Sequence, residues 1–309
     1  MLEFAVLGSG SSGNSAVLCL GETRILIDAG LSAKQLCLRL ELLGIDPDSL
    51  SGIVLTHEHG DHARGIDVFT RKRKLPIYAT AHTCEMVREN VKSEVIWRQF
   101  EAGGNFEIGG IQAESFSVPH DAVDPVGFVF RCGKSSVGVL SDVGHVTRMI
   151  IDRLRGVHTL FAEANYDEVM LQNDTIRPWS TKQRISNRHG HLSNDQTAEL
   201  VNAVASPHLC QVILGHLSGD CNTPELAERI ISEQLHKSGY TDVSVECAER
   251  KDPLPFRPAA KEIAVEVPSL EEVSEPIPSV DYTATDNPKP IRVQESVAVS
   301  EWKQSEWVF

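Results

Sequence analysis

The sequence lacks the features of a secreted, membrane-bound or disulfide-stabilised protein. Its first six residues carry an acid and no basic stretch before an apolar run, unlike a secretory signal. No apolar run approaches the ~20 residues that a membrane-spanning helix needs. The seven cysteines are odd in number and never stand in CxxC spacing, which favours buried thiols in a reducing compartment over disulfides or a thiolate metal site. We therefore expect a cytoplasmic protein without membrane contact.

The sequence also lacks an excess of positive charge. Its 29 Lys and Arg stand against 43 Asp and Glu, a net charge of −14, which argues against a broad basic surface for nucleic acid. Two local basic stretches, 71–74 and 177–188, are either ordinary solvated surface or contacts for a phosphate backbone. A nucleic acid substrate stays open because bound divalent ions supply positive charge where a phosphate would lie.

A run of metal-binding side chains, Thr56-His57-Glu58-His59-Gly60-Asp61-His62, directly follows the apolar stretch 52–55. Imidazole and carboxylate bind Zn²⁺ and related ions, and a ligand set with open positions can activate water. In extended chain His57 and His59 point the same way and can hold one ion. After the turn at Gly60, Asp61 and His62 can face a second ion. Histidines also cluster on solvated loops, but four ligands in this spacing favour a metal site.

Three further candidate ligands stand where apolar strands end. His120 follows 115–119, Asp142 follows 136–141 and His216 follows 212–215. Strand ends are the usual place for functional residues in α/β proteins. Each of the three alone would be an ordinary capped strand end, but in this order after the run 57–62 they predict the remaining ligands.

Strands and helices alternate through both halves of the chain, which predicts an α/β sandwich with helices outside. We expect helices at 31–43, from the metal-binding run to about 74, and at 83–90, 146–154, 193–205 and 224–237. Ser193 with Gln196 predicts a capping box, and Thr223 before Pro224 a second helix start. Residues 8–14 match GxGxxG, but strand rather than helix follows, so we reject a nucleotide cofactor and expect a turn.

The composition changes after about residue 250. Eight of the 15 prolines fall in 251–309, where six basic residues stand against eleven acidic ones. Such a segment buries too little apolar surface to offset its ordering entropy. We therefore expect a catalytic domain at 1–250 and an acidic, Pro-rich disordered tail at 251–309. The aromatic end of the tail, from Trp302 to Phe309, is either inert or a docking peptide for a protein partner.

These motifs together resemble those of the metallo-β-lactamase-fold hydrolases, which match Asp28, the run 57–62, His120, Asp142 and His216. The resemblance implies a four-layer αββα sandwich and two divalent ions, Zn²⁺ or Mn²⁺, with Fe²⁺ also compatible. It implies one ion on His57, His59 and His120. It implies the other on Asp61, His62 and His216, with Asp142 bridging. Asp28 would orient the ligand loop from behind, and Asp61 would also take part in catalysis.

Within this family the sequence looks like the YycJ/WalJ-like branch, described as exonucleases acting on DNA. The likeness covers about residues 3–248, including 8–15, 141–144, 163–165, 190–194 and 215–218. One departure is Tyr166, where a histidine is usual, and another is the triplet 219–221; both bear on substrate contacts. The candidate substrate-binding residues in or beside these motifs are Ser12, Asn14, Asn165 and Asn222.

His191 and Glu163 resemble the His and Glu of tRNA-processing relatives, which are linked to protonation of the leaving group. A carboxylate beside an imidazole raises its proton affinity, and departure of an alkoxide from phosphate is helped by a general acid. The alternative is that His191 merely caps the helix at 193–205.

We therefore expect a metal-dependent phosphodiesterase, a 5′-to-3′ exonuclease on single-stranded DNA or duplex ends, with Asp61, His191 and Glu163 as catalytic residues. A thioester or lactone hydrolase of the glyoxalase II kind would use the same ligands. A regulatory protein that keeps metal for stability is a third possibility, although a scaffold needs no proton donor. A secreted β-lactamase would need a signal peptide.

Overall fold

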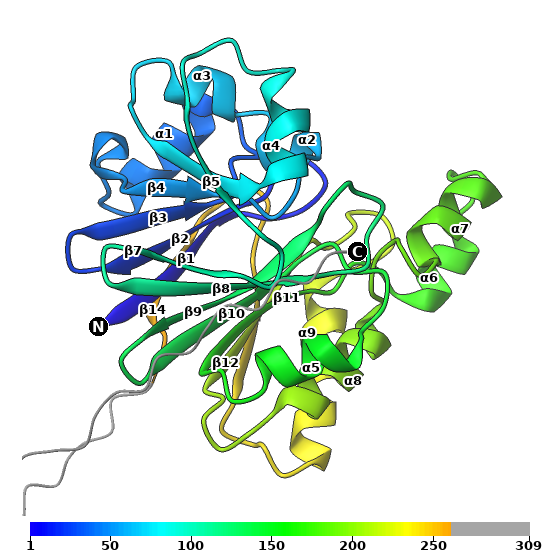
Figure 1. Ribbon diagram of the computed structural model, residues 1–309. Coiled ribbons are helices and arrows are strands. Elements are labelled where there is room, and N and C mark those ends of the chain that lie inside the picture. Colours follow the sequence, from blue (N-terminus) through cyan, green and yellow to red (C-terminus); the bar gives the residue numbers. More distant parts are fainter. Residues whose placement is uncertain (261–309) are drawn as a thin grey trace, which may run out of the picture. The chain divides into compact units, whose positions relative to one another are not determined.

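The computed structural model describes residues 1–260, and residues 261–309 lie outside this described part (Figure 1). The described strands form two seven-stranded sheets. The first contains, in spatial order, β14 (Leu254–Pro258), β1 (Leu2–Gly8), β2 (Ser15–Leu20), β3 (Thr23–Ile27), β4 (Gly52–Val54), β5 (Pro76–Thr80) and β6 (Ile96–Phe100). The second contains β13 (Ser244–Cys247), β12 (Gln211–Gly215), β11 (Thr159–Glu163), β10 (Ser135–Leu140), β9 (Val126–Cys132), β8 (Ile111–Ser117) and β7 (Asn105–Ile108).

The apolar residues of the strands divide between three cores. Successive side chains of a strand point to opposite faces, so a strand buried on both faces feeds two cores. In β1, Phe4 and Val6 pack between the two sheets, whereas Ala5 and Leu7 pack beneath the helices of the first sheet. In β12, Ile213 packs between the sheets, and its neighbours in the strand pack beneath the helices of the second sheet.

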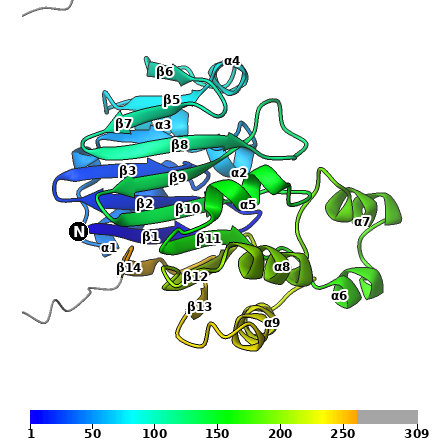
Figure 2. The same ribbon diagram turned by 60° about the horizontal axis from the view of Figure 1, so that its bottom comes forward.

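Helices cover the outer face of each sheet (Figures 1 and 2). The helices α1 (Ala33–Leu42), α3 (Ile66–Thr70) and α4 (Ala81–Arg88) pack on the first sheet. The helices α5 (Arg148–Leu154), α8 (Asn194–Val204) and α9 (Pro224–Lys237) pack on the second. This arrangement confirms the predicted αββα sandwich.

The predicted helix starts are present. Ser193 and Gln196 form the capping box of α8, and Thr223 caps α9 with Pro224 at its first turn. A short 3-10 helix, η1 (Pro47–Ser49), precedes β4. The helix expected after the metal-binding run is divided into α2 (Gly60–Ala63) and α3 by Gly65. A Cβ at Gly65 would lie 2.2 Å from the Leu31 carbonyl oxygen, so the chain packs too closely there for any side chain.

Two helices were not predicted, α6 (Glu168–Asn173) and α7 (Trp179–Ser186), and together they form a lobe at residues 167–187 beside α8 (Figure 2). Their sequences carry no apolar stripe: Leu171 is the buried residue of α6, and Lys182 that of α7. Without an amphipathic pattern the sequence offers little signal for a helix.

Strand β14 corrects the predicted boundary at residue 250. It pairs antiparallel with β1 at the edge of the first sheet, and the amide of Ala259 donates to the Leu2 carbonyl. Prolines are tolerated on edge strands, so Pro255 and Pro258 concealed a strand within a segment that reads as a tail. The folded part therefore extends at least to residue 259. The predicted disorder and aromatic docking peptide at 261–309 lie outside the described residues.

Within residues 1–260, no helix combines the length and the apolar character that crossing a bilayer requires.

Candidate metal centre

Three strands end in residues with a left-handed backbone. Asp28 follows β3, Asp142 follows β10 and His216 follows β12, with φ of 57°, 57° and 53°. Among residues 1–260 no other non-glycine residue has a positive φ. Such backbone costs about 1–3 kcal/mol per residue and persists where the surroundings hold it, commonly at functional sites. These three strand ends therefore mark a candidate site.

Parallel pairing explains why these strand ends meet. Strands β10, β11 and β12 are parallel neighbours, so their carboxyl ends bring Asp142, Glu163 and His216 to one edge. Strands β3 and β4 are also parallel neighbours, and they bring Asp28 next to the loop that follows β4. The amide of Asp28 donates to the Val54 carbonyl at 2.9 Å and fixes this junction.

A first cluster contains three imidazoles. His59 Nδ1 lies 3.1 Å from His57 Nε2 and 3.3 Å from His120 Nε2. Burial, together with neighbouring histidines, holds the pKa of His57 well below its usual range, and burial lowers the pKa of His120. Neutral imidazoles have the lone pair that a metal needs. His120 Nδ1 lies 3.1 Å from the Gly190 carbonyl, to which it can donate, so that Nε2 stays available to an ion.

A second cluster contains two carboxylates and two imidazoles. Asp142 Oδ2 lies 3.0 Å from His62 Nε2 and 3.2 Å from His216 Nδ1, while Asp61 Oδ2 lies 3.7 Å from His62 Nε2. The other Asp142 oxygen lies 3.8 Å from His120 Nε2 in the first cluster. Burial raises the pKa of Asp142, but His216 and His62 hold it well below its usual range. Asp142 is therefore an ionised carboxylate that faces both clusters.

The chemistry of these donors fits divalent ions. The potential ligand atoms within each cluster lie within 4.8 Å of one another. Nitrogen and carboxylate oxygen without thiolate suit Zn²⁺, Mn²⁺ and Fe²⁺. All seven predicted ligands lie in these two clusters: His57, His59 and His120 in the first, and Asp61, His62, Asp142 and His216 in the second.

Asp28 lies behind the ligand loop, at the position from which it was predicted to orient the loop. Its Oδ2 lies 2.7 Å from His62 Nδ1, and its two oxygens accept from the amide and the hydroxyl of Thr56 at 2.8 and 2.9 Å. Burial lowers the pKa of His62, but Asp142 and Asp28 raise it well above its usual value. The His62 ring is therefore held between two carboxylates, with Nε2 directed at the second cluster.

His191 and Glu163 form a pair at the edge of both clusters. Glu163 is fully buried; its Oε2 lies 3.0 Å from His191 Nδ1, and its Oε1 accepts from the amides of Val143 and Leu192 at 2.7 and 3.0 Å. Burial lowers the pKa of His191, but the charge and hydrogen bond of Glu163, with Asp142 and Asp121, raise it to about 9. The protonated imidazole is thus favoured near neutral pH.

Comparison with known proteins identifies the family. The profile of the family described as "Beta-lactamase superfamily domain" matches residues 23–216. The chain is 34% identical over 242 residues to the protein named Exodeoxyribonuclease YycJ of Bacillus anthracis, covering 77% of this chain and 91% of that protein. It is 36% identical over 238 residues to Exodeoxyribonuclease WalJ of Streptococcus pneumoniae, covering 75% and 88%. The chain belongs to the beta-lactamase superfamily, in the branch of the YycJ and WalJ proteins.

Solved structures of the superfamily share the fold. Yeast PDE1 has a TM-score of 0.62 at 14% identity, with 82% of this chain and 99% of that chain covered. The short form of human tRNase Z has a TM-score of 0.58 at 15% identity, with 82% and 98% covered. With its family and its ligand clusters, the chain is a metal-dependent hydrolase, as the sequence predicted.

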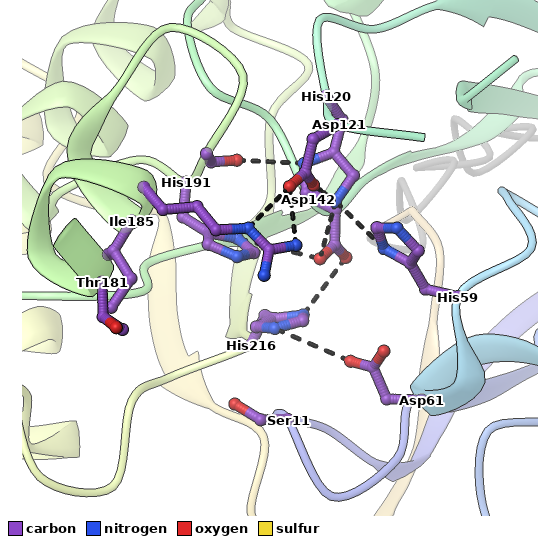
Figure 3. A pocket seen from close by; sticks show the side chains of 12 residues that line it. Ser11, His59, Asp61, His120, Asp121, Asp142, Thr181, Ile185, His191 and His216 are labelled. Atoms are coloured by element: carbon purple, nitrogen blue, oxygen red, sulfur yellow. Dashed lines mark hydrogen bonds and ion pairs between the residues drawn. The ribbon is translucent and has the colours of Figure 1, made fainter. Parts of the chain in front are cut away.

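The metal clusters of this superfamily member open into a cavity of about 250 Å³ (Figure 3). Four residues that line this cavity were not predicted from the sequence. They are Ser11, Asp121 and, from the unpredicted helix α7, Thr181 and Ile185. The position of Asp121 directly after His120 is a signal that could have found it, whereas α7 carries no such signal. The other lining residues are His59, Asp61, His120, Asp142, Arg184, Gly190, His191 and His216.

Asn14 and Ser12 do not line this cavity. Asn14 is buried, and its Nδ2 lies 3.2 Å from Asp61 Oδ2 and 3.0 Å from His62 Nε2. Its Oδ1 accepts from the Gly10 amide at 2.8 Å. Asn14, predicted to bind substrate, therefore holds the ligand loop against the turn 8–14. Ser12 is exposed, but its neighbour Ser11 faces the cavity instead.

Asn165 and Asn222 are also placed differently from their prediction. Asn165 is buried, and its Nδ2 donates to the His216 carbonyl at 2.8 Å. Asn222 is buried, and its Nδ2 lies 2.8 Å from the Ala164 carbonyl and 2.8 Å from Asn194 Oδ1. These contacts fix the loops behind the cavity, and neither residue lines the cavity.

The two basic stretches differ in their relation to the cavity. In the stretch 71–74, Arg71 pairs with Asp67 and Arg73 with Asp48, and no residue of the stretch lines the cavity. These contacts support the solvated-surface alternative. From the stretch 177–188, Arg184 lines the cavity.

Proposed function

We propose that this hydrolase is an exonuclease that cleaves phosphodiester bonds of DNA from the 5′ end with two divalent ions. The observation that carries the proposal is the His191–Glu163 pair, 3.0 Å apart, beside the ligand clusters. An alkoxide leaving from phosphate is strongly basic and needs a proton, whereas the thiolate released from a thioester needs it far less. The names of the YycJ and WalJ relatives, both exodeoxyribonucleases, support the same substrate class.

The two clusters suggest how the ions would be held. His57, His59 and His120 would hold one ion, Asp61, His62 and His216 the other, and Asp142 would face both. Zn²⁺ or Mn²⁺ fits these donors, and Fe²⁺ is also compatible. When bound, such ions supply a water of lowered pKa and positive charge for the phosphoryl oxygens.

The remaining steps belong to side chains of the protein. Asp61 is partly exposed at the cavity, where its carboxylate can accept a hydrogen bond from the attacking water and orient it. The Nδ1–H group of His191 can donate a hydrogen bond to Glu163. The Nε2–H group on the other side of the ring is then free to give its proton to the leaving oxygen. Glu163 is held by two backbone amides and therefore keeps the ring in one orientation.

One experiment tests the whole proposal. The metal content of the purified protein is measured, and DNA and RNA labelled at either end, single-stranded and duplex, are digested with Mn²⁺ or Zn²⁺. We expect about two ions per chain and release of nucleotides from the 5′ end of DNA. Cleavage of thioesters or lactones without any cleavage of nucleic acid would overturn the proposal in favour of the glyoxalase II kind of chemistry.

The role of His191 is tested by His191→Ala. We expect the variant to keep its metal and its melting temperature but to lose about 10²–10⁴-fold in turnover, the usual contribution of a general acid. His82→Ala, in a well-exposed histidine on α4, is the matched control and should keep full activity. Full activity of His191→Ala would exclude the role of proton donor.

A further inference from the structure

The α6–α7 lobe presents a cation to the metal cavity in a protein of net charge −14. The stretch 175–194, which includes α7, contains four Lys and Arg residues and no Asp or Glu. It therefore reverses the average charge of the chain beside the ligand clusters. A local excess of cations beside a phosphodiesterase site is complementary to a polyanionic substrate.

The four cations of this stretch differ in availability. Arg177 is held by Asp174 at 2.8 Å and by Asp220 at 2.7 Å, and Lys182 is buried and donates to the Gln172 carbonyl. Arg188 is exposed but does not line the cavity. Arg184 lines the cavity, and its side chain is 71% exposed. Arg184 is therefore the cation of this stretch that a substrate in the cavity can reach.

Asp121 holds the Arg184 guanidinium at the cavity. Asp121 Oδ2 accepts from Arg184 Nε at 2.8 Å and lies 2.7 Å from Nη2. The other oxygen of Asp121 lies 3.3 Å from His120 Nε2 in the first cluster. An ion pair this exposed contributes only about 0–1 kcal/mol, so the guanidinium can turn from Asp121 to a phosphate at little cost.

We propose that Arg184 binds a phosphate of the nucleic acid strand adjacent to the bond that is cleaved, and that Asp121 is a positioning residue that aims it. This inference rests on the proposed function. The planar guanidinium can bind two phosphate oxygens at once, which a lysine ammonium cannot reproduce in the same geometry. Arg184 also neutralises Asp121, whose charge would otherwise repel a phosphate entering the cavity.

The test compares steady-state cleavage of end-labelled DNA by the metal-loaded protein and its Arg184→Gln, Arg184→Lys and Arg148→Gln variants. We expect Arg184→Gln to raise KM about tenfold with kcat within about twofold, and to reduce the slope of log(kcat/KM) against log salt by about one. Arg184→Lys should have the wild-type salt slope, because its charge is kept, but a KM between those of the wild type and Arg184→Gln. Arg148 is fully exposed on α5, and its variant should match wild type.

The contribution of Asp121 is tested in a double-mutant cycle. If Asp121 aims the guanidinium, Arg184→Gln should raise KM less in the Asp121→Asn background than in wild type. Equal effects in both backgrounds would exclude the positioning role.

Several outcomes would overturn the assignment of Arg184. A wild-type KM and salt slope in Arg184→Gln would do so. So would a fall in metal content and melting temperature that Arg184→Lys fully restores, because that pattern indicates a structural role. If the wild-type protein cleaves no nucleic acid, the proposed function itself fails. If the wild-type protein cleaves DNA and Arg184→Gln has the same KM and salt slope, the inference about Arg184 fails but the proposed function stands.

Discussion

Single residues outside the two clusters set the orientation of the ligands. Asp28 belongs to neither cluster, yet its carboxylate accepts from Thr56 at the start of the ligand loop and faces His62 Nδ1. The backbone of Asp28 itself is left-handed, with φ of 57°. A hydrogen bond of this kind fixes the tautomer and the ring orientation of a metal-binding histidine.

We expect Asp28→Ala to lower metal affinity about 10–100-fold while the protein stays folded, because His62 loses its acceptor. Metal affinity is measured by competition with a chromophoric chelator, and folding by circular dichroism. Asp28→Asn can still accept from Thr56, but its amide is a poorer partner for His62, so it should also lose affinity. The exposed Asp152 on α5 provides the control Asp152→Ala. Wild-type affinity in Asp28→Ala would contradict the orienting role.

At the scale of elements, β14 shows how a strand can be concealed by composition. Its two prolines and its acidic surroundings resemble a tail, yet it pairs with β1, and the carbonyls at its end accept hydrogen bonds from the second sheet. Thr159 Oγ1 donates to the Ala259 carbonyl at 2.8 Å, and Gln211 Nε2 to the Pro258 carbonyl at 3.1 Å. These residues therefore connect the first sheet to β11 and β12.

Two truncations test this boundary. A chain that ends at residue 260 keeps every element described above and should melt within a few degrees of the full chain. A chain that ends at residue 250 loses β14, including Leu254 and Phe256, which pack against two of the cores. We expect it to lose several kcal/mol, since burial of each such side chain contributes about 1.5–3 kcal/mol. Equal melting temperatures for the two chains, measured by calorimetry, would contradict the importance of β14.

At the scale of the whole folded unit, the metal centre lies where the two sheets meet. The loop of residues 57–62 follows β4 of the first sheet, whereas His120, Asp142 and His216 follow β8, β10 and β12 of the second. Ions held in the two clusters would therefore connect the sheets as well as supply the chemistry. Binding of a metal to the folded state alone adds to the free energy of unfolding.

Removal of metal should therefore lower the melting temperature of the entire unit. With free metal at a hundred times its dissociation constant, the loss is about 2.7 kcal/mol, or roughly 5–10 °C for a domain of this size. Differential scanning calorimetry before and after chelation measures it, and adding Zn²⁺ or Mn²⁺ should restore the transition. In His59→Ala, which lacks a ligand of the first cluster, the shift on chelation should be smaller. A transition insensitive to chelation would contradict the connection between the sheets.

The ligands could be predicted from the chain alone because their signals are local: an imidazole or carboxylate where an apolar strand ends, or the close spacing of the run 57–62. His57, Asp142 and His216 all have this signal, and the alternation of strands and helices along the chain predicted the sandwich with helices outside. The cavity wall carried no such signal. Arg184 reaches Asp121 across 63 positions of sequence because α7, a helix without an apolar stripe, lies beside the loop that carries His120.

The amides of Asn14, Asn165 and Asn222 matched motifs, but the packing of loops against loops determined that they face inward. Local patterns report which side chains a strand delivers; long-range packing decides which of them a substrate can reach.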